Sequence, residues 1–195
     1  MNDNPQRLLP SDHITPISLF IQQLHDPHEH VRQHAQAQLV ALGQTAIPTL
    51  IEALHDREHW YAVIEVLIAI GEDALPALLA CIRDDALVDF ALHAIIGIGS
   101  PAVVPLLTLL NDQDSTVRTW SMVALGGLHD PRAIEPLRAM LRDPHDDVRQ
   151  SAVRTLGILH ATQSLPDLHW LQDHDPLPEV RQAAYDAIAL IEKNT

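Results

Sequence analysis

The sequence of 195 residues contains a single cysteine, Cys81, and no long apolar segment. One cysteine cannot form an intrachain disulfide, which is typical of proteins of the cytoplasm, where thiols stay reduced. The N-terminal segment MNDNPQRLLPSDHITP is polar and lacks the apolar core of a signal peptide. No apolar run approaches the roughly 20 residues that a membrane-spanning helix needs. We therefore expect a cytoplasmic chain that does not enter a membrane.

Positive charge is also scarce. The chain has 12 lysine and arginine residues against 26 acidic residues, which gives a formal net charge of −14, and Lys193 is the only lysine. Such a chain repels phosphate backbones and anionic lipid headgroups, so binding to nucleic acid or to an anionic membrane surface is not expected. Another protein with a basic or neutral surface is the partner that this charge favours.

Aromatic residues and glycines are few. Aromatic residues make up 4% of the chain, whereas 47% of its residues are hydrophobic, so leucine, isoleucine, valine and alanine must fill the core. An aliphatic composition with only seven glycines favours helices over strands. The composition alone therefore indicates a helical protein.

A pattern of apolar or small side chains recurs six times. In each copy, a first position is followed by such residues four, eight and eleven positions later, and these offsets lie on one face of an α-helix. The first positions are Val31, His59, Leu87, Val117, Val148 and Val180. The residues at offset four are Ala35, Val63, Ala91, Ser121, Ala152 and Ala184, and those at offset eight are Leu39, Leu67, Ile95, Leu125, Leu156 and Ile188. Those at offset eleven are Leu42, Ile70, Ile98, Leu128, Leu159 and Ile191. Each copy predicts one helix, the second helix of a repeated unit.

A proline recurs in similar register before each of these helices, at Pro16, Pro48, Pro76, Pro105, Pro136 and Pro166. Because proline is tolerated in the first turn of a helix, these residues predict a first helix in each unit. Pro105 and Pro136 are expected to lie deeper and to kink or restart their helices. Glycine marks the ends of the second helices, either directly after them or slightly earlier. These glycines are Gly43, Gly71, Gly99, Gly126 and Gly157.

The predicted unit is a helix, a turn and a second helix. One such pair cannot bury both of its apolar faces, but stacked pairs can. We therefore predict an all-α fold, an α-solenoid of six helical hairpins, as one domain over residues 16–195, with residues 1–15 as an N-terminal tail or cap. The predicted units cover residues 16–43, 44–71, 72–99, 100–129, 130–160 and 161–195.

Three segments carry a resemblance to a known family: VRQHAQAQLVALG, VRTWSMVALGGLHDPRAIEPL and VRQSAVRTLGIL. They resemble the HEAT-like repeats of the phycobilisome-lyase (PBS lyase) family, over roughly residues 16–193. The resemblance implies an α-α superhelix whose second helices line a concave surface. It also implies an inter-repeat ladder, in which the arginine after the first valine bonds acidic residues in neighbouring turns. The ladder positions are Arg32, Arg118, Arg149 and Arg181, with Asp26, Asp114, Asp147 and Glu179 nearby in sequence.

Units two and three depart from this ladder, because Trp60 and Val88 stand where the arginine is expected. Offsets two, three and six of a second helix point away from the core face. In units two to four, these offsets gather side chains suited to binding a partner or ligand on the concave surface. The predicted patch consists of Tyr61, Glu65, Asp89, Phe90, His93 and Trp120.

Two features of this patch carry alternative interpretations. Asp89 precedes His93 by one helical turn and could orient its imidazole. Alternatively, Trp60 and Phe90 fill the core in place of the missing arginines, which leaves Tyr61 and Trp120 as ordinary half-exposed aromatics.

Catalytic and metal chemistry is mostly absent from the sequence. His25, His28, His30 and His34 cluster, but no closed set of four ligands appears, so we predict neither a metal nor a cofactor. Among proteins with HEAT-like repeats, the di-iron deoxyhypusine hydroxylases carry His-Glu pairs at offsets two and three, and this chain has none there. Cys81 lies in an apolar run and is predicted to fill the core rather than to act as a nucleophile. We identify no catalytic residue.

These observations leave three functions open. The first is a protein-binding scaffold or adaptor that holds a partner on the concave face and that could enter a hetero-oligomer. The second is a bilin lyase subunit or a chromophore-handling protein associated with the phycobilisome, in which the aromatic patch would hold a bilin. The third and weakest is a metal-dependent enzyme. A change in bilin absorption on mixing would separate the second function from the first.

Overall fold

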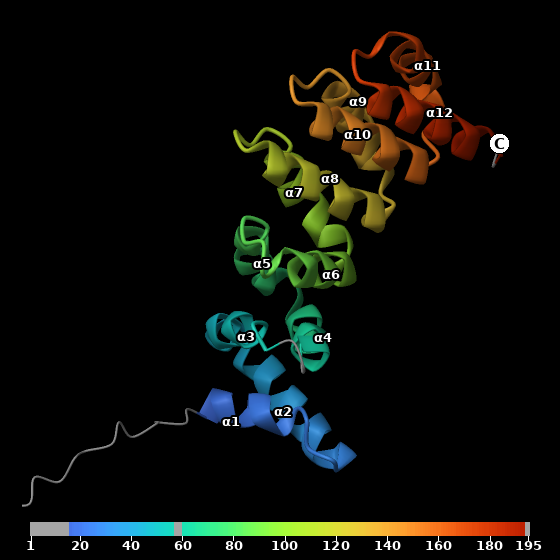
Figure 1. Ribbon diagram of the computed structural model, residues 1–195. Coiled ribbons are helices and arrows are strands. Elements are labelled where there is room, and N and C mark those ends of the chain that lie inside the picture. Colours follow the sequence, from blue (N-terminus) through green and yellow to red (C-terminus); the bar gives the residue numbers. More distant parts are fainter. Residues whose placement is uncertain (1–15, 57–59, 194–195) are drawn as a thin grey trace, which may run out of the picture.

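The computed structural model describes residues 16–56 and 60–193, and every regular element within these ranges is helical (Figure 1). The all-α solenoid is thereby confirmed. Its helix pairs are α1 (Pro16–Gln23) with α2 (Glu29–Leu42), α3 (Ile47–Ala53) with α4 (Trp60–Ile70), α5 (Leu75–Cys81) with α6 (Val88–Ile98), α7 (Val103–Leu109) with α8 (Ser115–Leu128), α9 (Ile134–Met140) with α10 (Asp146–Ile158), and α11 (Leu165–His174) with α12 (Pro178–Lys193). Residues 1–15, predicted to be a tail or cap, lie outside the described residues.

Short 3₁₀ helices join each pair to the next. They are η1 (Gly43–Thr45), η2 (Gly71–Ala74), η3 (Ser100–Ala102), η4 (Pro131–Ala133) and η5 (Thr162–Ser164). Because each 3₁₀ helix delays the start of the following α-helix, Pro105 and Pro136 fall at the third residue of α7 and α9. Backbone N–H groups in a first turn have no partner within the helix. Neither proline therefore interrupts its helix, and the prediction of a kink was wrong.

Three glycines end second helices as predicted. Gly43, Gly71 and Gly99 have positive φ angles of 51°, 78° and 84°, a backbone conformation that side chains with a Cβ rarely adopt. Each stands directly after its helix, where the chain turns into the next unit.

The other two glycines do not end their helices. Gly126 and Gly157 lie inside α8 and α10 and are buried. His129 and His160, with φ angles of 52° and 49°, take the left-handed position instead. The prediction that Gly126 and Gly157 mark helix ends was therefore wrong, and their missing side chains serve packing between helices.

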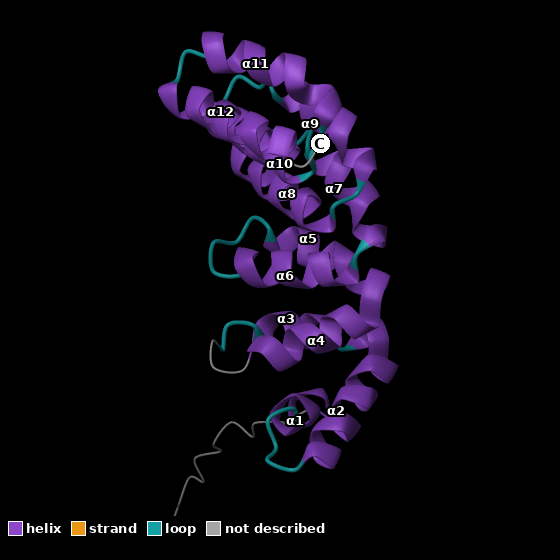
Figure 2. Cartoon of the chain, turned by 90° about the vertical axis from the view of Figure 1, so that its right-hand side faces the viewer, coloured by secondary structure: helices purple, strands orange, loops and turns teal. Residues whose placement is uncertain are grey.

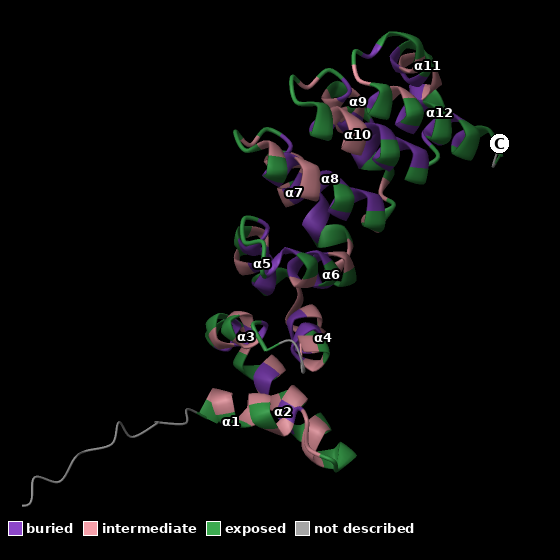
Figure 3. Ribbon diagram, viewed as in Figure 1, coloured by how far each residue is buried: buried purple, intermediate pink, exposed green. Residues whose placement is uncertain are grey.

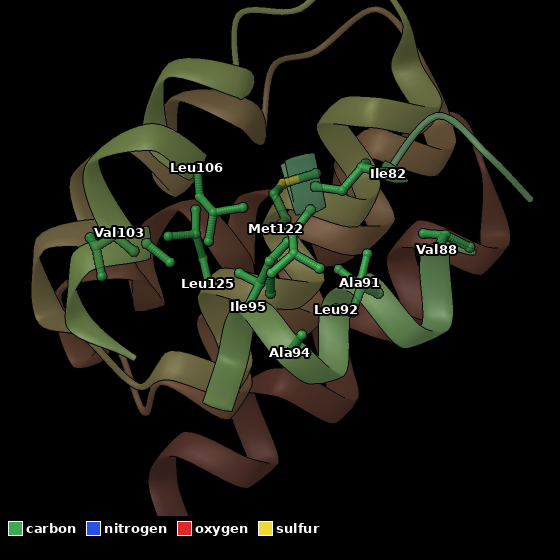
Figure 4. Packing of buried hydrophobic residues seen from close by; sticks show 14 of the residues in the cluster. Ile82, Val88, Ala91, Leu92, Ala94, Ile95, Val103, Leu106, Met122 and Leu125 are labelled. Carbon is green, nitrogen blue, oxygen red and sulfur yellow. The ribbon is translucent and has the colours of Figure 1, made fainter. Parts of the chain in front are cut away.

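The apolar core runs as one cluster through all the pairs (Figure 3). All residues at offsets four and eight are buried, as the periodicity predicted. Side chains from neighbouring elements meet there, and Ile95, Leu106 and Leu125 interlock between α6, α7 and α8 (Figure 4). Offset eleven behaves differently, because it falls in the last turn of a second helix or, at Leu159, directly after the helix. Only Ile191 of that set is buried, and Leu42 is 38% exposed.

The pairs stack in chain order into a curved solenoid (Figure 2). The even-numbered helices, α2 to α12, pack on one another along the whole stack, whereas the odd-numbered helices make fewer contacts with each other. The row whose helices approach more closely lies on the inside of a curved stack. We call the even-numbered helices the inner row.

Within the described residues, no single helix is long and apolar enough to cross a membrane. A bent pair, Val88–Ile98 with Ser100–Leu109, meets that test by length and composition only, with an angle of 115° between its helices.

Candidate functional site

An aspartate stabilises the turn between the two helices of most units. Its Oδ1 accepts a hydrogen bond from the backbone N–H two residues later, at 2.8–3.0 Å, which forms an Asx turn. These turn aspartates are Asp26, Asp84, Asp112, Asp143 and Asp175. The turn thereby holds each carboxylate in a fixed place at one edge of the stack.

Two ladder arginines connect consecutive turns of this kind. The Nε and Nη2 groups of Arg118 donate to the carboxylate of Asp143 in the next unit, at 2.9 Å each, and Nη1 donates to the Asp112 carbonyl at 2.8 Å. Arg149 repeats the arrangement one unit later, with Asp175 at 2.8 and 3.1 Å. The side chains of both pairs are largely inaccessible, at most 12% exposed, and the forked geometry satisfies the guanidinium on two sides.

This geometry also sets the ionisation of the two acceptors. Burial alone would raise the pKa of the Asp143 carboxyl, but hydrogen bonds from Arg118 and from the His145 N–H hold that pKa below its usual value. For Asp175, bonds from Arg149 and the Leu177 N–H outweigh burial and lower the pKa in the same way. Both carboxylates are therefore charged at neutral pH, and the ladder is ionic.

Arg32 and Arg181 share the other half of the pattern. Nη1 of Arg32 donates to the Asp26 carbonyl at 2.8 Å, and Nη1 of Arg181 donates to the Asp175 carbonyl at 2.6 Å. Each of these arginines therefore fastens the start of its helix to the turn before it.

The acidic residues that stand close to these arginines in sequence have other partners. Asp114 caps α8 by accepting from the Thr116 N–H at 2.9 Å, and Asp147 accepts from the Val148 N–H at 2.8 Å. The Glu179 carbonyl, rather than its carboxylate, accepts from Gln150. The carboxylates of Asp114 and Asp147 therefore bond N–H groups at the start of their own helices, whereas Asp26 contacts Arg32 through its carbonyl.

Where ladder arginines are missing, other groups hold the units together. Arg83, in the turn before α6, bonds the carboxylate of Asp112 in the following turn. Between α4 and α6, the rings of Trp60 and Phe90 lie 5.3 Å apart, and both side chains are half-buried against the core. The interpretation of Trp60 and Phe90 as packing residues thus describes their position well.

The packing rings extend into an exposed surface. Tyr61 meets Trp60 edge to face with ring centroids 5.7 Å apart, and His93 lies 5.8 Å from Trp60 and 6.4 Å from Tyr61. Tyr61 is 58% exposed, and His93 is also exposed. We call Trp60, Tyr61, Phe90 and His93 the ring cluster. Edge-to-face contacts fix the rings relative to one another, so the cluster presents a preformed aromatic surface on the inner row.

The remaining patch residues are less closely associated. Glu65 is half-buried and Asp89 is exposed. In the described chain, Asp89 forms no hydrogen bond with His93, whose neighbours are the rings of Trp60 and Tyr61. Trp120 is half-buried against the core on α8 and makes no ring contact with the cluster. The structure therefore brings three of the six predicted residues, Tyr61, Phe90 and His93, together with Trp60.

The sequence interpretation missed apolar residues exposed elsewhere on the inner row. Val123, Ile158 and Leu190 are 41%, 43% and 40% exposed, at offset six or ten of α8, α10 and α12. Val123 stands at an outward offset of unit four but was not included in the patch, and Ile158 and Leu190 would have been identified only if offset ten had been followed as well.

Two observations concern metal and nucleophilic chemistry. No cluster of three or more histidine, cysteine, aspartate or glutamate side chains that could hold a metal occurs within residues 16–56 and 60–193. Cys81 is buried, and burial raises the pKa of its thiol. A thiol with a raised pKa is a poor nucleophile at neutral pH.

The solved structures that are similar to this chain include the following three. The complex of CpcE and CpcF of phycocyanin lyase from Nostoc sp. PCC7120 matches with a TM-score of 0.52 and 21% identity, over 99% of this chain and 70% of that chain. Human deoxyhypusine hydroxylase in complex with glycerol matches with a TM-score of 0.49 and 19% identity, over 91% and 84%. A computationally designed armadillo repeat protein for modular peptide recognition matches with a TM-score of 0.46 and 22% identity, over 88% and 98%. At 21% identity, the similarity to the CpcE and CpcF complex shows a shared fold and nothing more.

Sequence comparison gives a family. No curated protein matches the chain significantly. The family described as HEAT repeats matches residues 17–96, 87–157 and 140–195, which together span nearly the whole sequence. This match agrees with the ordered stacking of helix pairs and with the turn-to-turn ladder. The chain belongs to the HEAT repeat family.

Proposed function

We propose that this chain is a protein-binding scaffold that holds a partner on its inner row, with the ring cluster as the principal contact. The observation that carries the proposal is the position of the cluster. It stands where the ladder arginine is absent, and it directs Tyr61 and His93 into solvent rather than closing over the core.

The physical properties of the cluster suit recognition. Interfaces draw much of their binding free energy from aromatic residues that are held rigidly and lose little entropy on binding. Trp60 contacts both exposed rings, and Phe90 packs against Trp60. Val123, Ile158 and Leu190 extend the exposed apolar surface along the inner row. A partner that lies along this row would bury several such residues together.

The negative charge of the chain indicates which type of partner it prefers. Glu65 and Asp89 lie on the same two helices as the ring cluster, and the whole chain has a formal charge of −14. A basic or neutral segment with apolar side chains is therefore the preferred partner. No cofactor or metal enters this proposal.

Photocrosslinking in cells tests the proposal. A benzophenone-bearing residue is placed at Tyr61 or Val123 on the inner row, and at Val104 of α7 as a control that is 61% exposed. We expect the same identified protein to crosslink from both inner-row positions and not from Val104. Equal crosslinking from all three positions would contradict the proposal.

A matched pair of tyrosines then measures the contribution of the cluster with the purified partner. Tyr61 and Tyr185 are each 58% exposed, but Tyr185 lies on α12, away from the cluster. Tyr61→Ala should weaken binding at least about tenfold, because rigid interface aromatics are common hot spots. Tyr185→Ala should weaken binding much less than Tyr61→Ala does. Equal affinities for both variants and the native chain would remove the ring cluster from the proposal.

A second candidate function is the handling of a bilin, as in a lyase subunit. It is favoured by the fold shared with the CpcE and CpcF complex over 99% of this chain. The carboxylates of Glu65 and Asp89, on the same helices as the rings, would suit the pyrrole nitrogens of a bilin. A red-shifted or sharpened bilin absorption band that Tyr61→Ala abolishes would support this function, and an unchanged spectrum would oppose it.

A further inference from the structure

A groove separate from the inner row opens on the outer side, between α9 and α11. It has a volume of about 440 Å³ and is lined by Arg138, Leu141, Arg142, Pro166, Asp167, Trp170 and Leu171. Small-molecule sites commonly measure about 300 to 1,000 Å³ and combine apolar walls with a few polar groups. The groove matches this description.

One wall provides an available cation. Asp167 Oδ2 accepts hydrogen bonds from Nε and Nη2 of Arg138, at 3.0 and 2.7 Å. Nη2 of Arg142 lies 3.9 Å from the other oxygen of Asp167, and its side chain is 86% exposed. Arg138 is thus engaged, and Arg142 keeps a guanidinium that can bind another anion.

The local charge supports an anionic ligand in an otherwise acidic molecule. Arg138 also bonds Glu135, which stands outside the groove lining and is 70% exposed. With Glu135 counted, these four side chains are neutral, against −14 for the whole chain. Anions are therefore repelled less here than over most of the surface.

The other wall provides a flat apolar face. Trp170 is 58% exposed, and its indole stacks on His174 with ring centroids 5.0 Å apart and an interplanar angle of 12°. The His174 Nδ1 lies 2.9 Å from the Trp170 carbonyl oxygen, which ties the imidazole to the helix. The stack holds the indole in one orientation, so binding costs little further ordering. Leu141 and Leu171, both nearly inaccessible, form the floor.

We propose that this groove binds a carboxylate attached to a flat apolar group. The guanidinium of Arg142 takes the carboxylate, because its planar fork matches the two oxygens. Trp170 and the leucine floor take the apolar group. A free aromatic acid and the C-terminal residue of a peptide both offer this chemistry.

Isothermal titration calorimetry with 4-biphenylcarboxylate tests the proposal, with 4-biphenylmethanol as the neutral probe. The acid should bind more tightly than the alcohol. Arg142→Gln should weaken binding of the acid at least about fivefold and leave the alcohol unaffected, since a charged hydrogen bond is lost. Trp170→Ala should weaken both probes. Arg154→Gln on α10 and Tyr185→Ala on α12 are controls with exposed side chains and should change neither affinity.

Two outcomes would overturn the proposal. One is the absence of binding by the acid to the native chain at millimolar concentration. The other is equal binding of acid and alcohol that Arg142→Gln does not alter. Circular dichroism of each variant separates loss of the groove from loss of folding.

A further pair of probes identifies the source of the ligand. A short peptide ending in phenylalanine is titrated as its free acid and as its amide. Tighter binding of the free acid than of 4-biphenylcarboxylate supports a peptide C-terminus, and the reverse order supports a small aromatic acid. If 4-biphenylcarboxylate binds and neither peptide does, the result also supports a small aromatic acid.

Discussion

Neighbouring units are joined differently in the two halves of the solenoid. In the C-terminal half, α8, α10 and α12 lie closely side by side (Figures 1 and 2). Two buried Arg–Asp pairs and two buried glycines lie at their contacts. In the N-terminal half, isoleucines separate the inner-row helices, and a Cβ on Gly97 would collide with the Ile68 side chain. There the rings of Trp60 and Phe90 join α4 to α6.

The comparison shows that the same repeat can be joined to its neighbour either by an ion pair or by aromatic rings. A forked ion pair satisfies its own polar groups and leaves nothing for a partner. A joint made of rings has edges and faces that remain available, and here two of its four members are exposed. The half that gives up the ladder is thus the half that offers an aromatic surface.

The largest expected effect comes from breaking the ladder. Asp175→Ala leaves Arg149 buried without its carboxylate, and we expect a loss of about 3–5 kcal/mol in the free energy of unfolding. Urea unfolding followed by circular dichroism measures it. Arg83→Ala removes a pair whose arginine side chain is 52% exposed and should cost less than about 1 kcal/mol. Similar costs for both variants would erase the distinction between buried and exposed joints.

The second largest expected effect comes from removing the aromatic contact between α4 and α6. Trp60→Ala removes a half-buried ring from between α4 and α6, and we expect a loss of about 2 kcal/mol, below the cost of a fully buried tryptophan. Tyr61→Ala removes an exposed ring of the same cluster and should change stability by less than about 0.5 kcal/mol. Thermal unfolding of both variants checks the difference. A larger loss for Tyr61→Ala would mean that the exposed ring is structural.

Glycine-to-alanine substitutions should destabilise the closely packed C-terminal half more than the N-terminal half. A Cβ on Gly157 would lie 3.0 Å from Cβ and 3.1 Å from Cα of Ala187 on α12, and the backbone cannot yield easily. Gly157→Ala should therefore cost about 1–2 kcal/mol. In Gly97→Ala, the obstacle is the flexible end of Ile68, and the gain in helix propensity, up to about 1 kcal/mol, offsets part of the strain. Chemical denaturation of both variants compares them, and a smaller loss for Gly157→Ala would contradict the packing argument.

The smallest expected effect is that of acid, which should reduce the stability of the C-terminal half as Asp143 and Asp175 become protonated. The pKa values of Asp143 and Asp175 in the folded chain lie below the ordinary value of 3.8. Their stabilisation is therefore fully present well above pH 3.8 and is lost as the pH falls through the lowered values. Hydrogen exchange of α10 and α12 between pH 5 and pH 3 should show this loss. In Asp175→Asn the dependence should be reduced, and an unchanged dependence would exclude Asp175 as its source.

Much of the fold followed from local patterns. Every residue at offsets four and eight is buried, because a side chain's position around its own helix depends only on helical periodicity. Proline and glycine positions predicted most helix ends for the same local reason. The errors at Pro105, Pro136, Gly126 and Gly157 arose where an intervening 3₁₀ helix or a close neighbouring helix changed the role of the residue.

The candidate site followed only in part. The absence of arginine in units two and three directed attention to α4 and α6, where Tyr61, Phe90 and His93 meet with Trp60. Trp120 and Asp89 do not join them. The groove at Arg142 and Trp170 was not foreseen, because its lining comes from α9 with the turn after it and from α11, which are separated in sequence by the whole of α10.

The sequence by itself determined which side of each helix is buried, since that depends on spacings within one helix. Only the tertiary structure decided which units touch through ions and which through rings. Arg118 and Arg149 find their carboxylates 25 and 26 residues away. Such partners depend on how far each pair is shifted and rotated against the next, and no spacing within a single helix sets that.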